Sequence, residues 1–247
     1  MNNSEIQRTD LKEFVLRLKS MGIKDLNKFE TLTSPDRNSI ARTLENIYFL
    51  GITDDKTNLT ELGMKVCEMP IDPRLAVSII KAGRKKFSCV EEVLIISSML
   101  SIPNIFYQVK DPTAIMKSKQ KVGVIEGDHL SLLAVFRAYK RAKEKSKFCK
   151  EMYINENLIK QAFEIYENIK LYLRKHQVEI KSSLDDDGED ILKSFLNGFF
   201  LNIAQKQPDS SYRSLRWNIP LHIHPSSVLY AISPDYVMYF DVISLII

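Results

Sequence analysis

Two histidines stand at a spacing that could serve a metal ion. His222 and His224 are separated by one residue, and side chains two apart in a strand project from the same face. Imidazole is a common zinc ligand, but a zinc site takes three or four protein ligands. No further ligand of suitable spacing follows in the sequence. Packing or surface roles are therefore favoured, and no metal site is predicted.

The acidic run at residues 185–190 is the second feature with a possible ligand, because it resembles the start of a calcium-binding loop. Such a loop needs a bidentate glutamate at its twelfth position. Counted from Asp185, that position is Leu196. The sequence therefore predicts no calcium site.

No catalytic arrangement emerges from the nucleophilic residues. Cys67, Cys89 and Cys149 are scattered without a CxxC pair, which fits core cysteines of a protein in a reducing compartment. The phosphate-loop pattern GxxxxGK[ST] is absent, as are GxGxxG, GxSxG and HExxH. We therefore predict no catalytic residue, and turnover by this chain alone is not expected.

The strongest charge feature is residues 110–150, where eleven Lys or Arg stand against four Asp or Glu. This excess of seven positive charges compares with a net charge of +4 for the whole chain. A phosphate backbone binds such a surface by releasing counterions. Cations at a solvated helix end, where the helix dipole favours them, explain the same pattern. The sequence leaves both interpretations open.

Composition indicates a folded, water-soluble protein. The 247 residues are 45% hydrophobic and 27% charged, with 8 Gly and 9 Pro, which excludes disordered and low-complexity classes. The first ten residues contain no apolar signal region, and residues 93–106 are too short and too polar to span a bilayer. An intracellular protein without a membrane partner is expected.

The first third predicts short helices around a tight turn. Apolar spacing places helices at residues 11–20, 35–50 and 60–67, the second with Ser34 as cap and Pro35 at its first position. The polar stretch 54–58 is a turn between two short extended arms. Helices followed by such a turn and another helix are typical of a winged helix.

The middle of the chain predicts a helical bundle, with helices near residues 73–84, 89–100, 128–139 and 158–173. Ser88 begins a capping box with Glu91, and Asp128 is placed to cap the third of these helices.

After a helix at 191–203, alternating residues predict strands around Leu221 and Ile223, at Val228, and from Val237 to Val242. The predicted class is α+β, mainly α, with a winged-helix-like domain at 1–70, a helical domain at 71–185 and a partial OB-fold barrel at 186–247.

Eight short strings, in order, resemble the C-terminal region of DEAH-box RNA helicases. They are residues 5–11 (EIQRTDL), 59–63 (LTELG), 70–73 (PIDP), 99–107 (MLSIPNIFY), 126–133 (EGDHLSLL), 198–200 (GFF), 223–227 (IHPSS) and 236–239 (YVMY). The last is most similar to the pre-mRNA-splicing members.

The resemblance implies a winged helix, a helicase-associated ratchet domain and most of an OB-fold. In that family these domains close a tunnel for single-stranded RNA over two RecA-like motor domains, which bind ATP and Mg²⁺ and hydrolyse the nucleotide. It implies contacts to the RNA backbone without sequence specificity. It also implies docking of G-patch-type activators or spliceosomal proteins, and a nuclear location. Since the motor motifs are absent here, no cofactor is expected in this chain.

Some family positions are altered. Asn157 stands where the family has an arginine, and Leu201 and Gln205 replace basic or polar residues. The RNA-contacting residues that the resemblance and the basic segment together imply are Arg137, Lys140, Asn155, Lys160, Asn202 and Lys206. The leading hypothesis is an RNA clamp. The alternative is a protein-docking module with little RNA affinity of its own.

Overall fold

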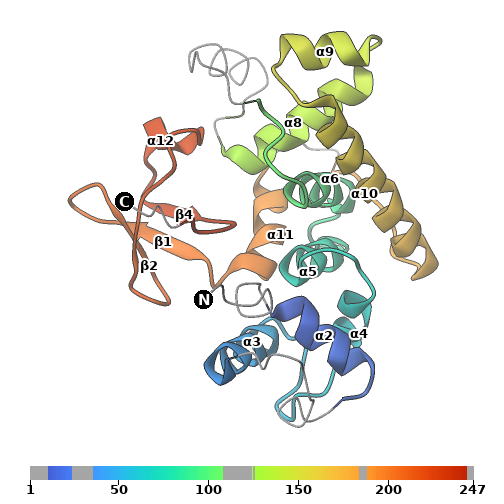
Figure 1. Cartoon of the computed structure of the whole chain (residues 1–247), viewed down its shortest axis with the longest axis vertical. Coiled ribbons are helices and arrows are strands. Elements are labelled where there is room, and N and C mark those ends of the chain that lie inside the picture. Colours follow the sequence, from blue (N-terminus) through green and yellow to red (C-terminus); the bar gives the residue numbers. More distant parts are fainter. Residues whose placement is uncertain (1–10, 24–35, 108–123, 125, 184–187, 244–247) are drawn as a thin grey trace, which may run out of the picture. The chain divides into compact units, whose positions relative to one another are not determined.

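The computed structural model describes residues 11–23, 36–107, 124, 126–183 and 188–243. It contains two compact units, residues 1–77 and 78–247, and each is described by itself (Figure 1). Several predictions lie outside the described residues: the string at 5–10, the helix start at Ser34 and Pro35, the basic stretch at 110–123, and residues 185–187 of the acidic run.

The first unit is built from helices α2 (Lys12–Ser20), α3 (Arg37–Phe49) and α4 (Glu61–Cys67), with the start of α5 (Pro73–Ala82) at its end. Its core contains Val15, Leu16, Ile47, Ile52 and Val66. Because α2 contacts both α3 and α4, its apolar stripe is covered by the other two helices.

A narrow turn separates α3 from α4. Thr53 and Leu59 form an isolated antiparallel bridge, and the Asp54 carboxylate accepts hydrogen bonds from the backbone N–H groups of Lys56 and Asn58. The turn and its two short arms lie where the sequence predicted them. The winged-helix assignment and the three domain boundaries stay predictions.

The α3 cap differs from the prediction. Asp36, rather than Ser34, is the N-cap, and its carboxylate accepts from Ser39 N at 2.9 Å. This is the geometry that satisfies an otherwise unpaired N–H in the first turn. The same hydrogen bond lowers the pKa of Asp36.

Helix α6 (Val90–Leu100) forms the centre of the helical part of the second unit. Its sides are buried almost throughout, and it contacts α8 (Asp128–Arg141), α10 (Glu156–Lys175) and α11 (Glu189–Phe199) (Figure 1). The short helix α9 (Lys145–Glu151) connects to both α8 and α10. The apolar residues of the VEEVLIISSML segment lie on all sides of the helix, which explains why α6 lies in the middle.

Two predicted caps in this unit are wrong. Ser88 has a left-handed backbone (φ 49°) and its hydroxyl donates to Lys85 O, so it makes no capping box with Glu91. The Glu91 N–H instead donates to Lys181 O at 3.0 Å. Asp128 is the first residue of α8 and its side chain caps no helical N–H there. Contacts distant in the sequence displaced both local patterns.

A small antiparallel sheet follows α11. Strands β1 (Ile203–Lys206), β2 (Tyr212–Ser214), β3 (Pro220–Leu221) and β4 (Tyr236–Met238) are arranged in the order β3-β2-β1-β4. The predicted strand around Val228 is wrong, because Val228 is the N-cap of the short helix α12 (Leu229–Ile232). Helices with a small antiparallel sheet confirm the α+β, mainly α class. None of the described helices is long and apolar enough to cross a membrane.

Candidate nucleic-acid interface

Arg137 projects from α8 toward α6. Its guanidinium donates to the Glu92 carboxylate, whose side chain is only 2% exposed. Glu92 also accepts from the Ser182 hydroxyl and from Ser183 N. This cluster joins α8, α6 and the segment after α10. The Arg137 guanidinium is therefore used mainly in an ion pair that stabilises the packing of these elements.

Asn155 and Lys160 lie at the start of α10. Asn155 is the N-cap, and its side-chain oxygen accepts from Asn157 N and Leu158 N. Lys160 is exposed and forms an i,i+4 ion pair with Glu156 at 2.8 Å. That hydrogen bond lowers the pKa of Glu156. Lys160 thus shares its charge with a neighbouring carboxylate, and Asn155 stabilises a helix end.

Asn202 and Lys206 hold the C-terminal part together. The Asn202 amide donates to the carbonyls of Tyr239 and Phe240, which fastens the chain after β4 to the start of β1. The Lys206 ammonium donates to Ser233 O at 3.1 Å, at the C-terminal end of α12. Both polar groups therefore have partners inside the protein.

Lys140 differs from these residues, because it is exposed and forms no ion pair with a described residue. Its ammonium lies 5.9 Å from the ring centre of Tyr166. Four other cations on α8, on α9 and between them are also exposed and form no ion pair with a described residue. They are Arg141, Lys143, Lys147 and Lys150. Together with Lys140 they are called the α8–α9 cation group.

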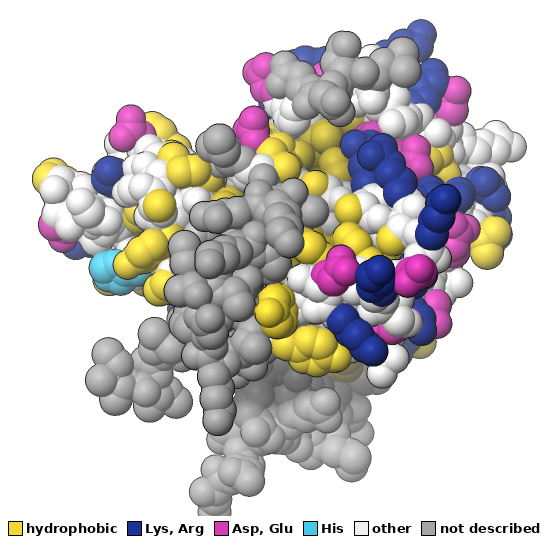
Figure 2. Space-filling model, turned by 90° about the horizontal axis from the view of Figure 1, so that it is seen from above, with side chains coloured by type: hydrophobic (Ala, Val, Ile, Leu, Met, Phe, Trp, Pro, Cys, Tyr) yellow, Lys and Arg dark blue, Asp and Glu magenta, His cyan; other side chains and the backbone are white. Residues whose placement is uncertain are grey.

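Lys145 supports the competing interpretation of the basic segment. Its ammonium donates to the carbonyls of Tyr139 and Lys140 at 2.6 and 2.8 Å, at the C-terminal end of α8. A cation there satisfies free carbonyls and the helix dipole. Lys145 thus stabilises the C-terminal end of α8, while the α8–α9 cation group faces solvent. In Figure 2, Lys and Arg side chains gather on the face seen from above, with Asp and Glu between them.

Asp128 connects the helical part to the segment before α12. Its carboxylate accepts from the Ser227 hydroxyl and from Val228 N, across about a hundred residues of sequence. The Ser227 hydroxyl oxygen in turn accepts from Leu229 N. Ser226 binds locally, with its hydroxyl 2.7 Å from His224 Nδ1. Asp128 and both serines therefore serve the fold.

The neighbouring His129 packs against Phe195, with ring centres 5.2 Å apart. Its Nε2 is buried and has no hydrogen-bond partner among the described residues. Burial lowers the pKa of His129 to about 4, against a smaller opposing effect of Asp128. The ring is therefore neutral in the folded protein at neutral pH.

We expect acid to destabilise the protein through His129. An unfolded histidine binds a proton below about pH 6.5, whereas folded His129 binds one only near pH 4. Between these values the unfolded state holds more protons, so the free energy of unfolding falls as the pH falls. Denaturant unfolding of the wild type and His129→Phe at several pH values measures this. The variant should lose less stability, and His222→Gln, which alters an exposed ring, should follow the wild type. Equal acid sensitivity of all three proteins would contradict the role of His129.

Metal and thiol chemistry find no support in the geometry of the described residues. Among them, no group of three or more His, Cys, Asp or Glu side chains is placed to hold a metal ion. Burial raises the pKa of the Cys67 thiol to about 11 and raises the pKa values of Cys89 and Cys149. A thiol with a raised pKa is a poor nucleophile at neutral pH.

The sequence did not reveal that several implied RNA-contacting residues have partners inside the protein. Nothing local indicates that Glu92 would accept from Arg137, or that backbone carbonyls would occupy Asn202 and Lys206. Sequence reasoning also passed over Trp217, the single tryptophan of the chain, which is 47% exposed. A lone tryptophan close to Arg213 and Arg216 in the sequence was the available signal.

The fold and these residues define a helicase-associated region. Residues 72–152 match the helicase associated domain (HA2), ratchet-like, and residues 191–245 match the oligonucleotide/oligosaccharide-binding (OB)-fold. The chain is 36% identical over 242 residues to the "Probable ATP-dependent RNA helicase DHX35" of Homo sapiens and to the protein of the same name from Pongo abelii. These matches cover 97% of this chain, which spans about a third of the length of either relative. The chain belongs to the DEAH-box RNA helicase family and corresponds to its C-terminal region.

Proposed function

We propose that this chain is the RNA-engaging part of an ATP-dependent RNA helicase, and that it holds single-stranded RNA by its backbone without reading sequence. The observation that carries this proposal is the α8–α9 cation group, which lies within the ratchet-like match at residues 72–152 and faces solvent. ATP and Mg²⁺ belong to RecA-like motor domains in cis or in trans, because no phosphate-loop motif stands in this sequence.

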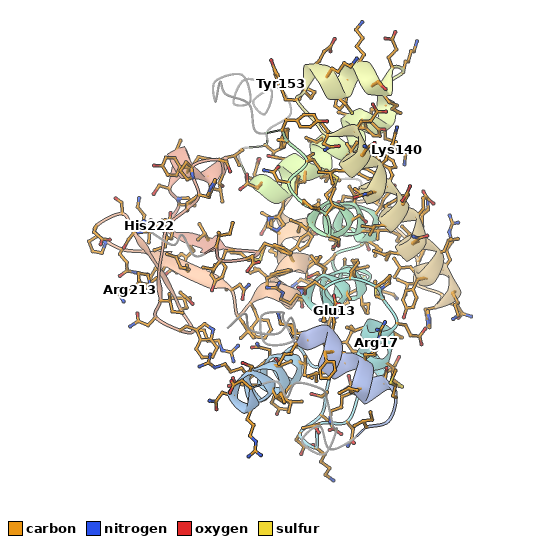
Figure 3. All side chains as sticks on the ribbon, viewed as in Figure 1. Glu13, Arg17, Lys140, Tyr153, Arg213 and His222 are labelled. Carbon is orange, nitrogen blue, oxygen red and sulfur yellow. The ribbon has the colours of Figure 1, made fainter. Side chains whose placement is uncertain are left out.

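Lys140 is the best-placed member of the group. Its ammonium lies 5.9 Å from the ring centre of Tyr166 on α10. Figure 3 places Lys140 on the helical side of the unit. Each phosphate that such a cation neutralises releases condensed counterions, so binding weakens as salt rises. Side chains that bind phosphate oxygens position the strand and carry no sequence information. The described cations therefore suit a clamp rather than a sequence reader.

Fluorescence anisotropy of a labelled single-stranded RNA, titrated at several salt concentrations, tests the proposal. We expect affinity to fall steeply with salt. The variant carrying Lys140→Ala, Lys143→Ala and Lys147→Ala should reduce the slope of log K against log salt by up to about 2, since each single-strand phosphate contact contributes about 0.7. Lys175→Ala, which removes an exposed and unpaired lysine outside the group, is the matched control. Affinity that is independent of salt, or equal losses for both variants, would contradict the clamp.

A protein-docking function is the second candidate. It is favoured by the internal bonding of four implied RNA contacts, Arg137, Asn155, Asn202 and Lys206, and by the altered positions Asn157, Leu201 and Gln205. In this case the region would bind a G-patch-type activator or a spliceosomal protein in the nucleus. Capture of a purified G-patch protein, with no RNA binding at low salt, would favour docking over the clamp.

A further inference from the structure

We propose that Ser183 is a phosphorylation site for an acidophilic protein kinase, that Arg137 and Arg141 receive the phosphate, and that the modification weakens RNA binding. The three residues line one pocket of about 390 Å³ in the second unit, together with Glu92. The effect on RNA rests on the proposed function, whereas the modification and its receiving pocket do not.

The sequence after Ser183 favours a kinase whose substrate groove is basic. Ser182 is followed by four carboxylates within seven residues, and no serine or threonine outside this pair is followed by more than two. Kinases select their substrates in part by such charge patterns. Ser183 has the strongest pattern of the chain, because five of the next seven residues are carboxylates: Asp185, Asp186, Asp187, Glu189 and Asp190.

Ser183 is also accessible in the fold. It is partly exposed and lies outside helices and strands, in the segment after α10. Its backbone N–H donates to the Glu92 carboxylate at 3.3 Å, which holds this segment on α6. The hydroxyl of Ser182 donates to the same buried carboxylate, so a phosphate there would lie against a negative charge and remove one of its donors. Ser183 is therefore the better acceptor of the two.

The reaction transfers the γ-phosphoryl group of ATP to the Ser183 hydroxyl oxygen. A bond forms between Oγ and the γ-phosphorus, and the bond from that phosphorus to the oxygen it shares with the β-phosphate breaks. ADP leaves with the electron pair of the broken bond, and the hydroxyl proton passes to the catalytic carboxylate of the kinase. The kinase and ATP are the co-reactants, and this chain supplies the acceptor oxygen.

Two arginines are placed to receive the phosphate. Arg137 and Arg141 lie on the same face of α8, because they are four residues apart in one helix. Arg141 is exposed and forms no ion pair with a described residue. Arg137 is one-third exposed and binds Glu92 through one terminal nitrogen. Since each guanidinium has five N–H donors, both can also donate to phosphate oxygens.

The charge of the pocket suits a phosphate even though Glu92 is present. Its described lining residues include two guanidinium groups and one carboxylate. A phosphoserine opposite arginines forms one to three charge-assisted hydrogen bonds. Such bonds would fasten the segment after α10 to α8 as well as to α6. They would also engage Arg141, which belongs to the α8–α9 cation group.

The first measurement locates the phosphate. The full chain is incubated with ATP and purified casein kinase II as the acidophilic kinase, and its fragments are mapped by mass spectrometry. We expect phosphate on Ser183, its loss in Ser183→Ala and its retention in Ser182→Ala. Replacing residues 185–187 with asparagine should remove most of the incorporation. An unmodified chain, or phosphate on Ser182 in place of Ser183, would contradict the proposal.

The second measurement tests the receiving pocket. Phosphorus NMR follows the second pKa of the phosphate, which is about 6 in phosphoserine. In the folded protein it should lie about one pH unit lower than in urea, because nearby cations favour the dianion. Arg141→Gln should remove most of this difference, and Lys175→Gln, which alters an exposed lysine outside the pocket lining, should keep it. Equal pKa values in the folded protein and in urea would show that the arginines do not bind the phosphate.

The third measurement concerns RNA and separates the two proposals. Phosphorylated chain should bind a labelled single-stranded RNA several-fold more weakly than unmodified chain at low salt, and the difference should shrink as salt screens the added charge. Ser183→Ala treated with kinase should bind like the unmodified chain. Equal affinity with and without phosphate would overturn the regulation and leave the clamp standing. If the unmodified chain binds no RNA, the clamp and its regulation both fail, while fragment mapping and the phosphate titration still decide the modification site.

Discussion

Replacing Arg137 with glutamine should lower the free energy of unfolding by about 2 to 4 kcal/mol, since removing one partner of a buried ion pair leaves the other charge uncompensated. The remaining partner is Glu92, which is 2% exposed and, among the described residues, would keep the Ser182 hydroxyl and Ser183 N as donors. Because the Arg137 side chain is itself one-third exposed, we place the effect at the lower end of values for buried pairs. Urea unfolding followed by circular dichroism measures it.

Lys140→Gln is the matched control for Arg137→Gln. It removes a positive charge from the same helix, three residues further on, where the side chain is exposed and forms no ion pair with a described residue. We expect it to change stability by less than about 0.5 kcal/mol, as surface substitutions do. Combining Arg137→Gln with Glu92→Gln should recover part of the lost stability, because no unpaired charge then stays buried. If Arg137→Gln is as stable as Lys140→Gln, the pair does not hold α8 to α6.

The different stability effects expected for Arg137→Gln and Lys140→Gln determine which residues should be replaced in RNA-binding experiments. A variant that neutralises Arg137 together with surface lysines would lose affinity by partial unfolding as well as by lost phosphate contacts. Lys140, Lys143 and Lys147 carry charge without a described ion pair, so their removal lowers the electrostatic attraction and breaks no described ion pair. The dependence of RNA affinity on Arg137 is therefore interpretable only where the variant is shown to be folded.

The helices could be predicted from the sequence because their signals are local. The i, i+3, i+4 spacing in residues 158–173 and the apolar run at 90–100 correspond to α10 and α6. The predicted caps at Ser88 and Asp128 are wrong because the groups involved bond to partners distant in the sequence. The Glu91 N–H donates to Lys181 O, and the Asp128 carboxylate accepts from the Ser227 hydroxyl and from Val228 N. No pattern within a window of ten residues reports such a partner.

The candidate site was harder to predict for the same reason. A lysine in a basic segment and a lysine that binds a carbonyl look alike in sequence, yet Lys140 is exposed whereas Lys206 donates to Ser233 O. Asn155 and Asn202 are likewise polar residues whose partners are backbone groups. Side-chain hydrogen bonds in proteins mostly go to backbone or water, so a polar residue of unknown fold is more often structural than ligand-binding.

The strings that resemble the helicase family also have structural explanations. In LTELG, Thr60 caps α4 by accepting from Gly63 N. In PIDP, the Asp72 carboxylate accepts from Arg74 N and from its guanidinium. The Asp of EGDHLSLL binds the last Ser of IHPSS. These strings identify the fold because they build its turns and connections, and they do not by themselves locate an RNA contact.

Gly63 has the tightest environment of these motif residues. A Cβ atom added to it would lie 2.0 Å from the carbonyl oxygen of Ile52 and 3.0 Å from its carbon. That carbonyl is fixed, because it accepts from Thr60 N at 3.0 Å and Ile52 is fully buried. The Cβ position is set by the backbone, so no side-chain rotation relieves the overlap. Helix α4 can approach the segment after α3 this closely because residue 63 has no side chain.

We therefore expect Gly63→Ala to lower the free energy of unfolding by about 3 kcal/mol, at the upper end of the cost of overpacking, since backbone must move. Gly83→Ala is the matched control: its added Cβ would meet Ile80 O at 3.4 Å and two valine methyl groups at ordinary contact distances. At a compatible position, replacing glycine with alanine is neutral or stabilises by up to about 1 kcal/mol, because the unfolded chain loses conformational freedom. Thermal and urea unfolding of both variants measure the difference. Equal midpoints would show that α4 does not pack on the Ile52 carbonyl, and LTELG would then need an explanation outside the fold.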